Sequence, residues 1–357
     1  MPSPIRFDSS LEVVQPDEDE VQAEMIRVFR KIQETTLKDY GHAVRGVHAK
    51  SHGLLTGRLT VRPDLPPTLA QGLFAAPGSY DVVLRLSTNP GDILDDSVST
   101  PRGLAVKVIG VSGERLPEAE GETQDFVLAN APAFTAPDAK AFLKSLKLLA
   151  ATTDTPQVFK KVFSAALRGL EGAIEAVGGK SATLISLGGH PETHILGETF
   201  YSQAALRWGD YVAKVAVAPV APALTALTGA SLDVNGKPNG LREAVSEYFR
   251  AHEGVWELRA QLLTDRATMP VEDASKPWSE EESPYVPVAR ITVAPQESWS
   301  DDKVRRLDDG LAFSPWHGLA AHRPLGSVMR ARRAVYPRSA GFRAEHNGCP
   351  IHAPTRA

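Results

Sequence analysis

The stretch Tyr80-Asp-Val-Val-Leu-Arg-Leu-Ser87 alternates strictly between two faces. A period of two residues is typical of a β-strand, whose side chains point to opposite sides of a sheet. The stretch therefore predicts a strand that presents an apolar face to a core and a more polar face to another layer. Tyr80, Val82, Leu84 and Leu86 form the first face, and Val83, Arg85 and Ser87 form the second.

Six other stretches have the β-rich or alternating character of strands. They cover residues 56–61, 102–109, 124–129, 211–217, 256–262 and 288–293. Helical patterns lie before, between and after them rather than alternating with each strand. This grouping favours an α+β fold built on an antiparallel sheet or barrel.

Three regions have the apolar period of a helix. In the first, residues 17–38, one apolar stripe runs from Val21 to Ile32, and acidic residues occupy the first turn. Residues 138–176 predict two helices broken near 153–156. The third region begins at Ser327, which is a suitable N-cap for a helix through Tyr336.

Composition excludes several classes of protein. The 357 residues are 42% hydrophobic and carry a formal net charge of −4, so no basic field attracts nucleic acid. The apolar stretch 212–232 is interrupted by Lys214, Pro219 and Pro222, so we expect no membrane span. The first residues lack the apolar run of a secretory signal, and we expect a cytoplasmic location.

Three short motifs predict no site of their own. Gly178-Gly-Lys-Ser181 lacks the first glycine of a phosphate loop and is interpreted as a helix end. His190-Pro-Glu-Thr-His194 resembles a zinc-protease motif, but its proline predicts a loop. Cys349, the single cysteine, has no His or Asp arrangement near it that would make it a nucleophile.

Three other segments are informative when they are considered together. The first is Arg45-Gly-Val-His48-Ala-Lys-Ser-His-Gly53. The second comprises Arg85-Leu-Ser87-Thr88, Pro101-Arg-Gly103 and Asp125-Phe-Val-Leu-Ala-Asn130-Ala-Pro-Ala-Phe134. The third is Arg332-Arg-Ala-Val-Tyr336-Pro337. Their order and spacing resemble those of the haem catalases, while the middle of the chain is more similar to small catalase-related proteins.

The resemblance implies a fold and an arrangement along the chain. We expect a single catalase-like domain, an antiparallel β-barrel with surrounding helices, over residues 1–357. Its N-terminal helix would span about 17–38 and its barrel core about 45–295, with a helical insertion in mid-chain. A helix over about 327–345 would carry the haem ligand.

Tyr336 is the expected iron ligand, and Arg332 the expected neighbour on the same helical face. The two residues are four apart, so a helix places them side by side. Tyrosine is an axial ligand of catalase-type haem. A free phenol has a pKa of about 10, so a nearby guanidinium would help to hold it as phenolate.

The resemblance also assigns roles to the other residues. His48 would be the distal base that moves the proton of a bound peroxide. Asn130 would donate a hydrogen bond to the peroxide, and Ser87 would hold His48 in place. Arg45 and Arg85 would pair with the haem propionates, and Phe134 would pack against the porphyrin.

The expected function is that of a haem b peroxidase or catalase. It would reduce hydrogen peroxide or organic hydroperoxides through an oxyferryl intermediate, with an organic electron donor. The sequence leaves open whether the protein forms a homo-oligomer. Tyr40-Gly-His-Ala-Val44 and Arg338 depart from the catalase pattern, which favours a slower release of oxygen than in catalases.

Two alternatives stay open at the level of sequence. One is a hydroperoxide-rearranging lyase of the allene oxide synthase type, in which a threonine precedes the distal histidine. Here that residue is Val47, as in catalases. The other is a haem-binding or peroxide-sensing protein without turnover.

Overall fold

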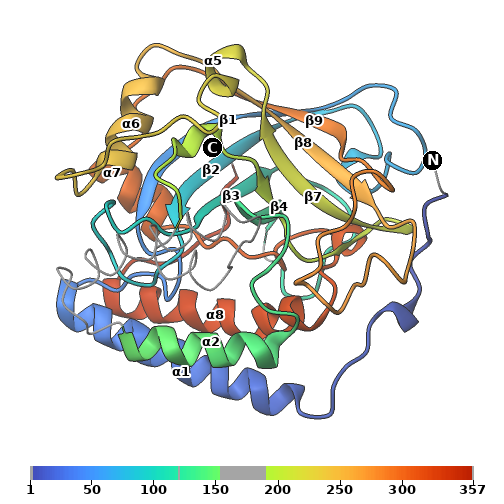
Figure 1. The fold of residues 1–357 in the computed structure, drawn as a ribbon, viewed down its shortest axis with the longest axis horizontal. Helices are drawn as coiled ribbons and strands as arrows, with labels where there is room; N and C mark the ends of the chain where they lie inside the picture. Colours follow the sequence, from blue (N-terminus) through green and yellow to red (C-terminus); the bar gives the residue numbers. More distant parts are fainter. Residues whose placement is uncertain (1–2, 120, 153–189, 356–357) are drawn as a thin grey trace, which may run out of the picture.

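An antiparallel barrel forms the centre of the molecule (Figure 1). The computed structural model describes residues 3–119, 121–152 and 190–355. All seven predicted strands are present. They are β1 (Ser51–Val61), β2 (Ser79–Thr88), β3 (Arg102–Ile109), β4 (Thr123–Ala129), β7 (Tyr211–Pro219), β8 (Gly254–Leu262) and β9 (Val286–Val293). The strand β3 has the predicted bounds, β1 begins five residues earlier than predicted, and each of the other five extends one or two residues beyond its predicted bounds.

Two short strands complete the sheet. The strands run in the order β5-β4-β3-β2-β1-β9-β8-β7-β6, and β5 (Phe200–Tyr201) also pairs with β7. This pairing closes β1 to β5 and β7 to β9 into an eight-stranded barrel, to which β6 (Leu206–Trp208) is added beyond β7. The α+β class and the antiparallel barrel are therefore confirmed.

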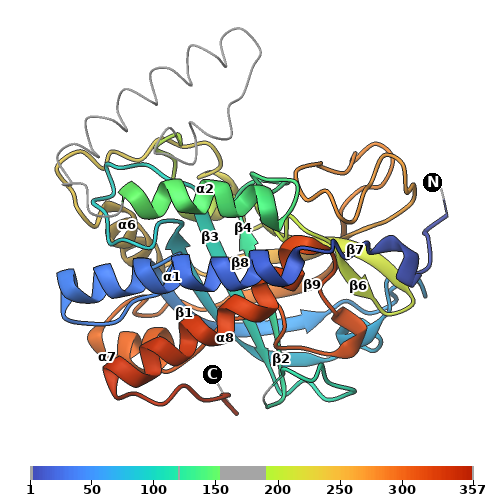
Figure 2. The same ribbon diagram turned by 90° about the horizontal axis from the view of Figure 1, so that it is seen from below.

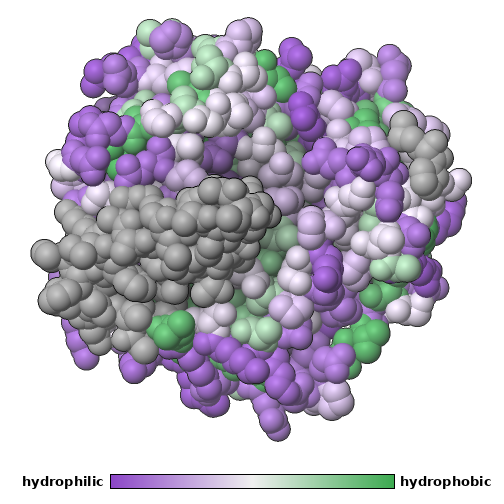
Figure 3. Space-filling view, viewed as in Figure 1, coloured by the Kyte–Doolittle hydropathy of each residue, from purple (hydrophilic) through white to green (hydrophobic). Residues whose placement is uncertain are grey.

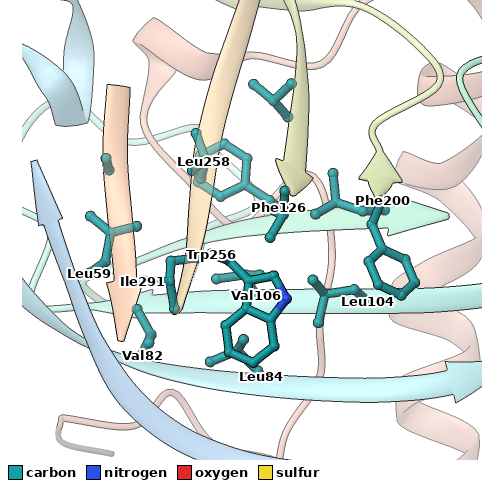
Figure 4. Close-up of a cluster of buried hydrophobic side chains, with 14 of the residues drawn as sticks. Leu59, Val82, Leu84, Leu104, Val106, Phe126, Phe200, Trp256, Leu258 and Ile291 are labelled. Atoms are coloured by element: carbon teal, nitrogen blue, oxygen red, sulfur yellow. The ribbon is translucent and has the colours of Figure 1, made fainter. Parts of the chain in front are cut away.

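The barrel interior is filled by one face of each strand. Figure 4 shows buried side chains from several strands meeting there, among them Leu84 of β2, Val106 of β3 and Trp256 of β8. The opposite face of β2 is also buried: Arg85 is 2% exposed and Ser87 is 3% exposed. A second layer therefore covers the outside of this part of the barrel.

Three helices form that layer. The helices α1 (Glu18–Tyr40), α2 (Ala139–Thr152) and α8 (Ser327–Asn347) lie side by side below the barrel in Figure 1, and Figure 2 shows them from that side. Their apolar faces meet in one buried cluster, because each helix carries apolar residues at helical spacing. The cluster contains Val21, Met25, Phe29, Ile32, Ala139, Leu143, Leu146, Ala331 and Val335.

The structure corrects one expectation about α8. Its N-cap is Gly326, with φ 86°, and Ser327 is the first helical residue. The Ser327 hydroxyl instead accepts a hydrogen bond from the Ala139 N–H at 3.1 Å. It thus ties α8 to the start of α2, which explains why it does not cap its own helix.

Other expectations concern the middle of the chain. The helix α2 confirms the first of the two mid-chain helices, while the second and Gly178-Gly-Lys-Ser181 lie outside the described residues. Residues 190–194 form a loop, as expected. The helix α6 (Gly240–Phe249) and the short α5 (Pro222–Thr225) and α7 (Asp301–Lys303) were not predicted.

The molecular surface is mainly polar on the face shown in Figure 3, where apolar residues occur in scattered groups outside the grey region. Within the described ranges, every helix is too short or too polar to cross a membrane.

Candidate functional site

Two adjoining cavities lie between the outer face of β2–β4 and the helix layer. The larger measures about 380 Å³ and the smaller about 120 Å³, and both are lined by His48 and Tyr336. Seven of the eight predicted site residues line one or both of them. Arg45, His48, Arg85, Ser87 and Tyr336 line the larger, and His48, Phe134, Arg332 and Tyr336 line the smaller.

His48 is held in an unusual backbone conformation on the barrel wall. Its φ is 52°, a left-handed value that costs a residue other than glycine about 1–3 kcal/mol. Its N–H donates to the Asn89 carbonyl at 2.8 Å, and the Ala49 N–H donates to the Pro90 carbonyl at 3.0 Å. These two bonds fix the segment against the loop that follows β2.

The imidazole of His48 is fixed as well. Its Nδ1 lies 3.0 Å from the Ser87 Oγ. A Cβ at position 103 would lie 2.5 Å from that same Nδ1, so only glycine lets the ring rest on β3. With Nδ1 engaged by the serine, Nε2 is the nitrogen left for a ligand.

The environment of His48 favours its neutral form. Burial, together with the positive charges of Arg85, Arg332 and Arg45, lowers the pKa of His48 to about 3. A neutral imidazole accepts a proton, so His48 is ready to act as a base throughout the neutral pH range.

A cluster of buried charges lies at one end of the larger cavity. The Asp308 carboxylate accepts from Arg85 Nε at 2.8 Å and is also paired with Arg45. Arg343 donates to the Asp308 carbonyl at 3.1 Å. Burial alone would raise the pKa of Asp308, but Arg85 and Arg45 outweigh it and hold the pKa below its ordinary value.

This cluster has an excess of positive charge. Arg45 and Arg85 pair with the Asp308 carboxylate and Arg343 bonds its backbone carbonyl, so the group formed by these four residues has an excess of two positive charges. Such an excess beside a cavity favours a ligand that carries two negative charges.

Tyr336 and Arg332 lie on α8, on the wall opposite His48. The Arg332 guanidinium lies 5.5 Å from the centre of the Phe134 ring, and one of its nitrogens is 3.7 Å from the Met329 sulfur. Among the described residues, no hydrogen bond joins Arg332 to Tyr336. The helix nevertheless brings both side chains into the smaller cavity.

Asn130 is the one predicted site residue that lines neither cavity. Its Oδ1 accepts from the Arg102 N–H at 2.9 Å, and its Nδ2 lies 2.7 Å from the His190 Nε2. Both ends of the amide are therefore engaged with the protein.

Comparisons with solved structures match almost the whole chain. Catalase A from Saccharomyces cerevisiae superposes with a TM-score of 0.61 at 16% identity, covering 99% of this chain and 70% of that one. A fungal catalase gives 0.61 at 18% identity, covering 99% and 68%, and a bacterial catalase gives 0.57 at 16%, covering 91% and 62%. No family model and no curated protein sequence matches the chain.

The chain has a catalase-like fold. Catalases hold haem through one tyrosine, and the residues that line the two cavities of this chain have the chemistry that such a group requires. Haem carries two propionates, which match the two excess positive charges of the arginine cluster. Haem also needs apolar walls, which Phe29, Val127 and Val335 supply.

In the part of the chain that the structure describes, no cluster of three or more His, Cys, Asp or Glu side chains is arranged to hold a metal ion.

Three residues at or beside the larger cavity were not predicted from the sequence. Arg343 lies seven residues after Tyr336 on α8, so helical spacing could have revealed it. Asp308 lies in η4, a π-helical turn (Val304–Asp309), and no periodic signal marks it. His317 lines the larger cavity, with its Nδ1 3.4 Å from the Asp125 carboxylate.

Proposed function

We propose that the protein is a haem-dependent peroxidase with some catalase activity, which acts on hydrogen peroxide or organic hydroperoxides. One observation carries the proposal: His48, hydrogen-bonded to Ser87, faces the same cavities as Tyr336 from the opposite wall. A base on one side and a phenol on the other are the two protein groups that a catalase-type site requires.

Several residues would hold the haem. Tyr336 would ligate the iron, and Arg45, Arg85 and Arg343 would bind the propionates by charge-assisted hydrogen bonds. Phe134 would pack against the porphyrin in the smaller cavity. When bound, haem supplies the redox chemistry that cleaves the O–O bond.

His48 would move the proton of the substrate. Its neutral imidazole accepts the proton from the hydroperoxide O–H, and the resulting imidazolium returns it to the departing oxygen. Ser87 keeps the ring oriented for both transfers, through its contact with Nδ1.

A variant of His48 tests this role. We expect His48→Ala to retain haem and to lose about 10²- to 10⁴-fold in the rate of peroxide cleavage, the usual contribution of a positioned acid–base group. The rate is measured by loss of hydrogen peroxide and by oxidation of a small organic donor. His252→Ala removes an exposed histidine and should leave both rates unchanged.

The outcomes separate the proposed enzyme from a haem-binding or peroxide-sensing protein without turnover. A wild-type protein that binds haem but turns over neither hydrogen peroxide nor an organic hydroperoxide would contradict the enzyme assignment. Equal rates in wild type and His48→Ala would remove His48 from the reaction.

A further inference from the structure

Asn130, the asparagine expected to contact the peroxide, and Asn89 differ in how their side chains are used. The amide of Asn130 is engaged at both ends. It receives the Arg102 N–H and contacts His190, whose side chain is 9% exposed, while Arg102 is 1% exposed. These contacts join the end of β4 to β3 and to the loop at residue 190. They account for Asn130 without any ligand.

Asn89 has the opposite character. It lines the smaller cavity together with His48 and Pro101. Of the residues that the structure describes, none hydrogen-bonds its side chain, and it is only half-buried. An amide beside a cavity that has no protein partner is available to a ligand.

The backbone of Asn89 is fixed relative to the distal base. Its carbonyl accepts the His48 N–H at 2.8 Å, and its own N–H donates to the Pro101 carbonyl at 2.9 Å. It follows directly after β2, which carries Ser87, the partner of the His48 ring. Asn89 is therefore tied to His48 more closely than Asn130 is.

We propose that Asn89, in place of Asn130, supplies the amide that binds the hydroperoxide beside His48. The inference rests on the proposed function. The amide N–H would donate to the peroxide oxygen that becomes negative as His48 takes its proton. An O–H bond of the substrate breaks, an N–H bond forms at the imidazole, and the amide stabilises the resulting charge. A fixed donor aimed at a developing charge costs no reorganisation during the reaction.

Cyanide is a suitable probe, because it occupies the distal side of ferric haem as an anion and is not turned over. We expect Asn89→Ala to load haem normally and to bind cyanide about 3- to 10-fold more weakly, the effect of one lost hydrogen bond. The matched variant Asn130→Ala should weaken cyanide binding less and lower thermal stability more. Affinities are measured by titrating the haem absorption spectrum.

A second variant distinguishes the loss of the amide donor from a folding defect. Asn89→Asp keeps the size of the side chain but replaces a donor with a negative charge, so we expect a loss of cyanide affinity at least as large. A loss in Asn89→Ala no larger than that in Asn130→Ala would overturn the assignment, although the proposed function would stand. A wild-type protein that takes up no haem would instead overturn both.

Discussion

His48 combines three features that are rarely found together in a structural histidine. Its backbone is left-handed, its ring is fixed by Ser87, and burial keeps it neutral. The strained backbone costs about 1–3 kcal/mol, which the bonds to the segment after β2 help to offset. Strain of this kind concentrates at functional sites, because the surrounding structure is built to hold one side chain in a defined place.

Arg332 provides a test of electrostatics on the opposite wall. In haem-loaded protein, we expect Arg332→Ala to shift the acid transition of the Tyr336-ligated spectrum upward by about one pH unit, because a nearby cation favours the phenolate. The measurement is a spectrophotometric pH titration. Arg338 is an exposed arginine two residues after Tyr336 that lines neither cavity, so Arg338→Ala is the control. An identical acid transition in wild type and Arg332→Ala would exclude a role for Arg332 in stabilising the phenolate.

Sequence patterns predicted seven residues that line the two cavities, but they did not predict every residue at or beside them. His48, Ser87 and Tyr336 were predicted because each belongs to a short motif in the expected order. Asp308 could not be predicted, because an acidic residue in an irregular turn is ordinarily exposed, and only the fold reveals the arginines around it. Asn130 was predicted from a motif, but a motif match does not reveal which groups the side-chain amide contacts in the folded protein.

At the scale of secondary-structure elements, the segment from Asp301 to Asp309 is part of the connection between the barrel and α8. It contains α7 and η4, and its last turn places Asp308 among three arginines that come from separate parts of the chain. Single π-helical turns are often found at functional sites. Here the turn positions a carboxylate that partly neutralises the cluster.

We expect Asp308→Asn to lower the free energy of unfolding of the haem-free protein by about 3–5 kcal/mol, because it leaves buried guanidinium groups without their partner. Added haem should stabilise this variant more than it stabilises wild type, since its propionates would supply the missing negative charge. Urea unfolding with and without haem measures both effects.

The control for this variant is Asp302→Asn. Asp302 pairs with Arg306 on the surface, where both side chains are about 60% exposed, so the change should cost little. Equal stabilisation of Asp308→Asn and wild type by haem would argue against propionate binding at this cluster.

At the scale of the whole molecule, the barrel could be predicted because the long strands have a recognisable β-rich or alternating sequence pattern. The strands β5 and β6 have two and three residues, too few for a period of two to be recognised. The closing contact between β5 and β7 therefore depends on tertiary structure. The helices α1 and α2 were predicted from their apolar periodicity. For α8, Ser327 was predicted as the N-cap, whereas it is the first residue of the helix.

Buried neutral histidines make the molecule sensitive to acid. Burial lowers the pKa of His322 to about 4 and that of His190 to about 3. Unfolded histidines have a pKa of about 6.5 and take up a proton as the pH falls below that value, while the folded ones stay neutral. Stability is therefore lost between pH 7 and pH 5, by about 2 kcal/mol for each such histidine.

A variant isolates one of these contributions. We expect His322→Gln to reduce the difference in unfolding free energy between pH 7 and pH 5 by about 2 kcal/mol, even if it destabilises the protein at both values. Urea unfolding of the haem-free protein at the two pH values gives this difference. Replacing the exposed His252 with glutamine should not change it. An undiminished difference in His322→Gln would be inconsistent with a neutral buried imidazole.

The central claim is that Tyr336 ligates a haem iron opposite His48. The visible absorption spectrum of haem-loaded wild type and Tyr336→Phe tests it most directly. We expect one haem per chain and a high-spin ferric spectrum of the tyrosinate type in wild type, and we expect that spectrum to be lost in Tyr336→Phe because phenylalanine has no ligating oxygen. The same tyrosinate spectrum in both proteins, or no haem uptake by wild type, would contradict the account.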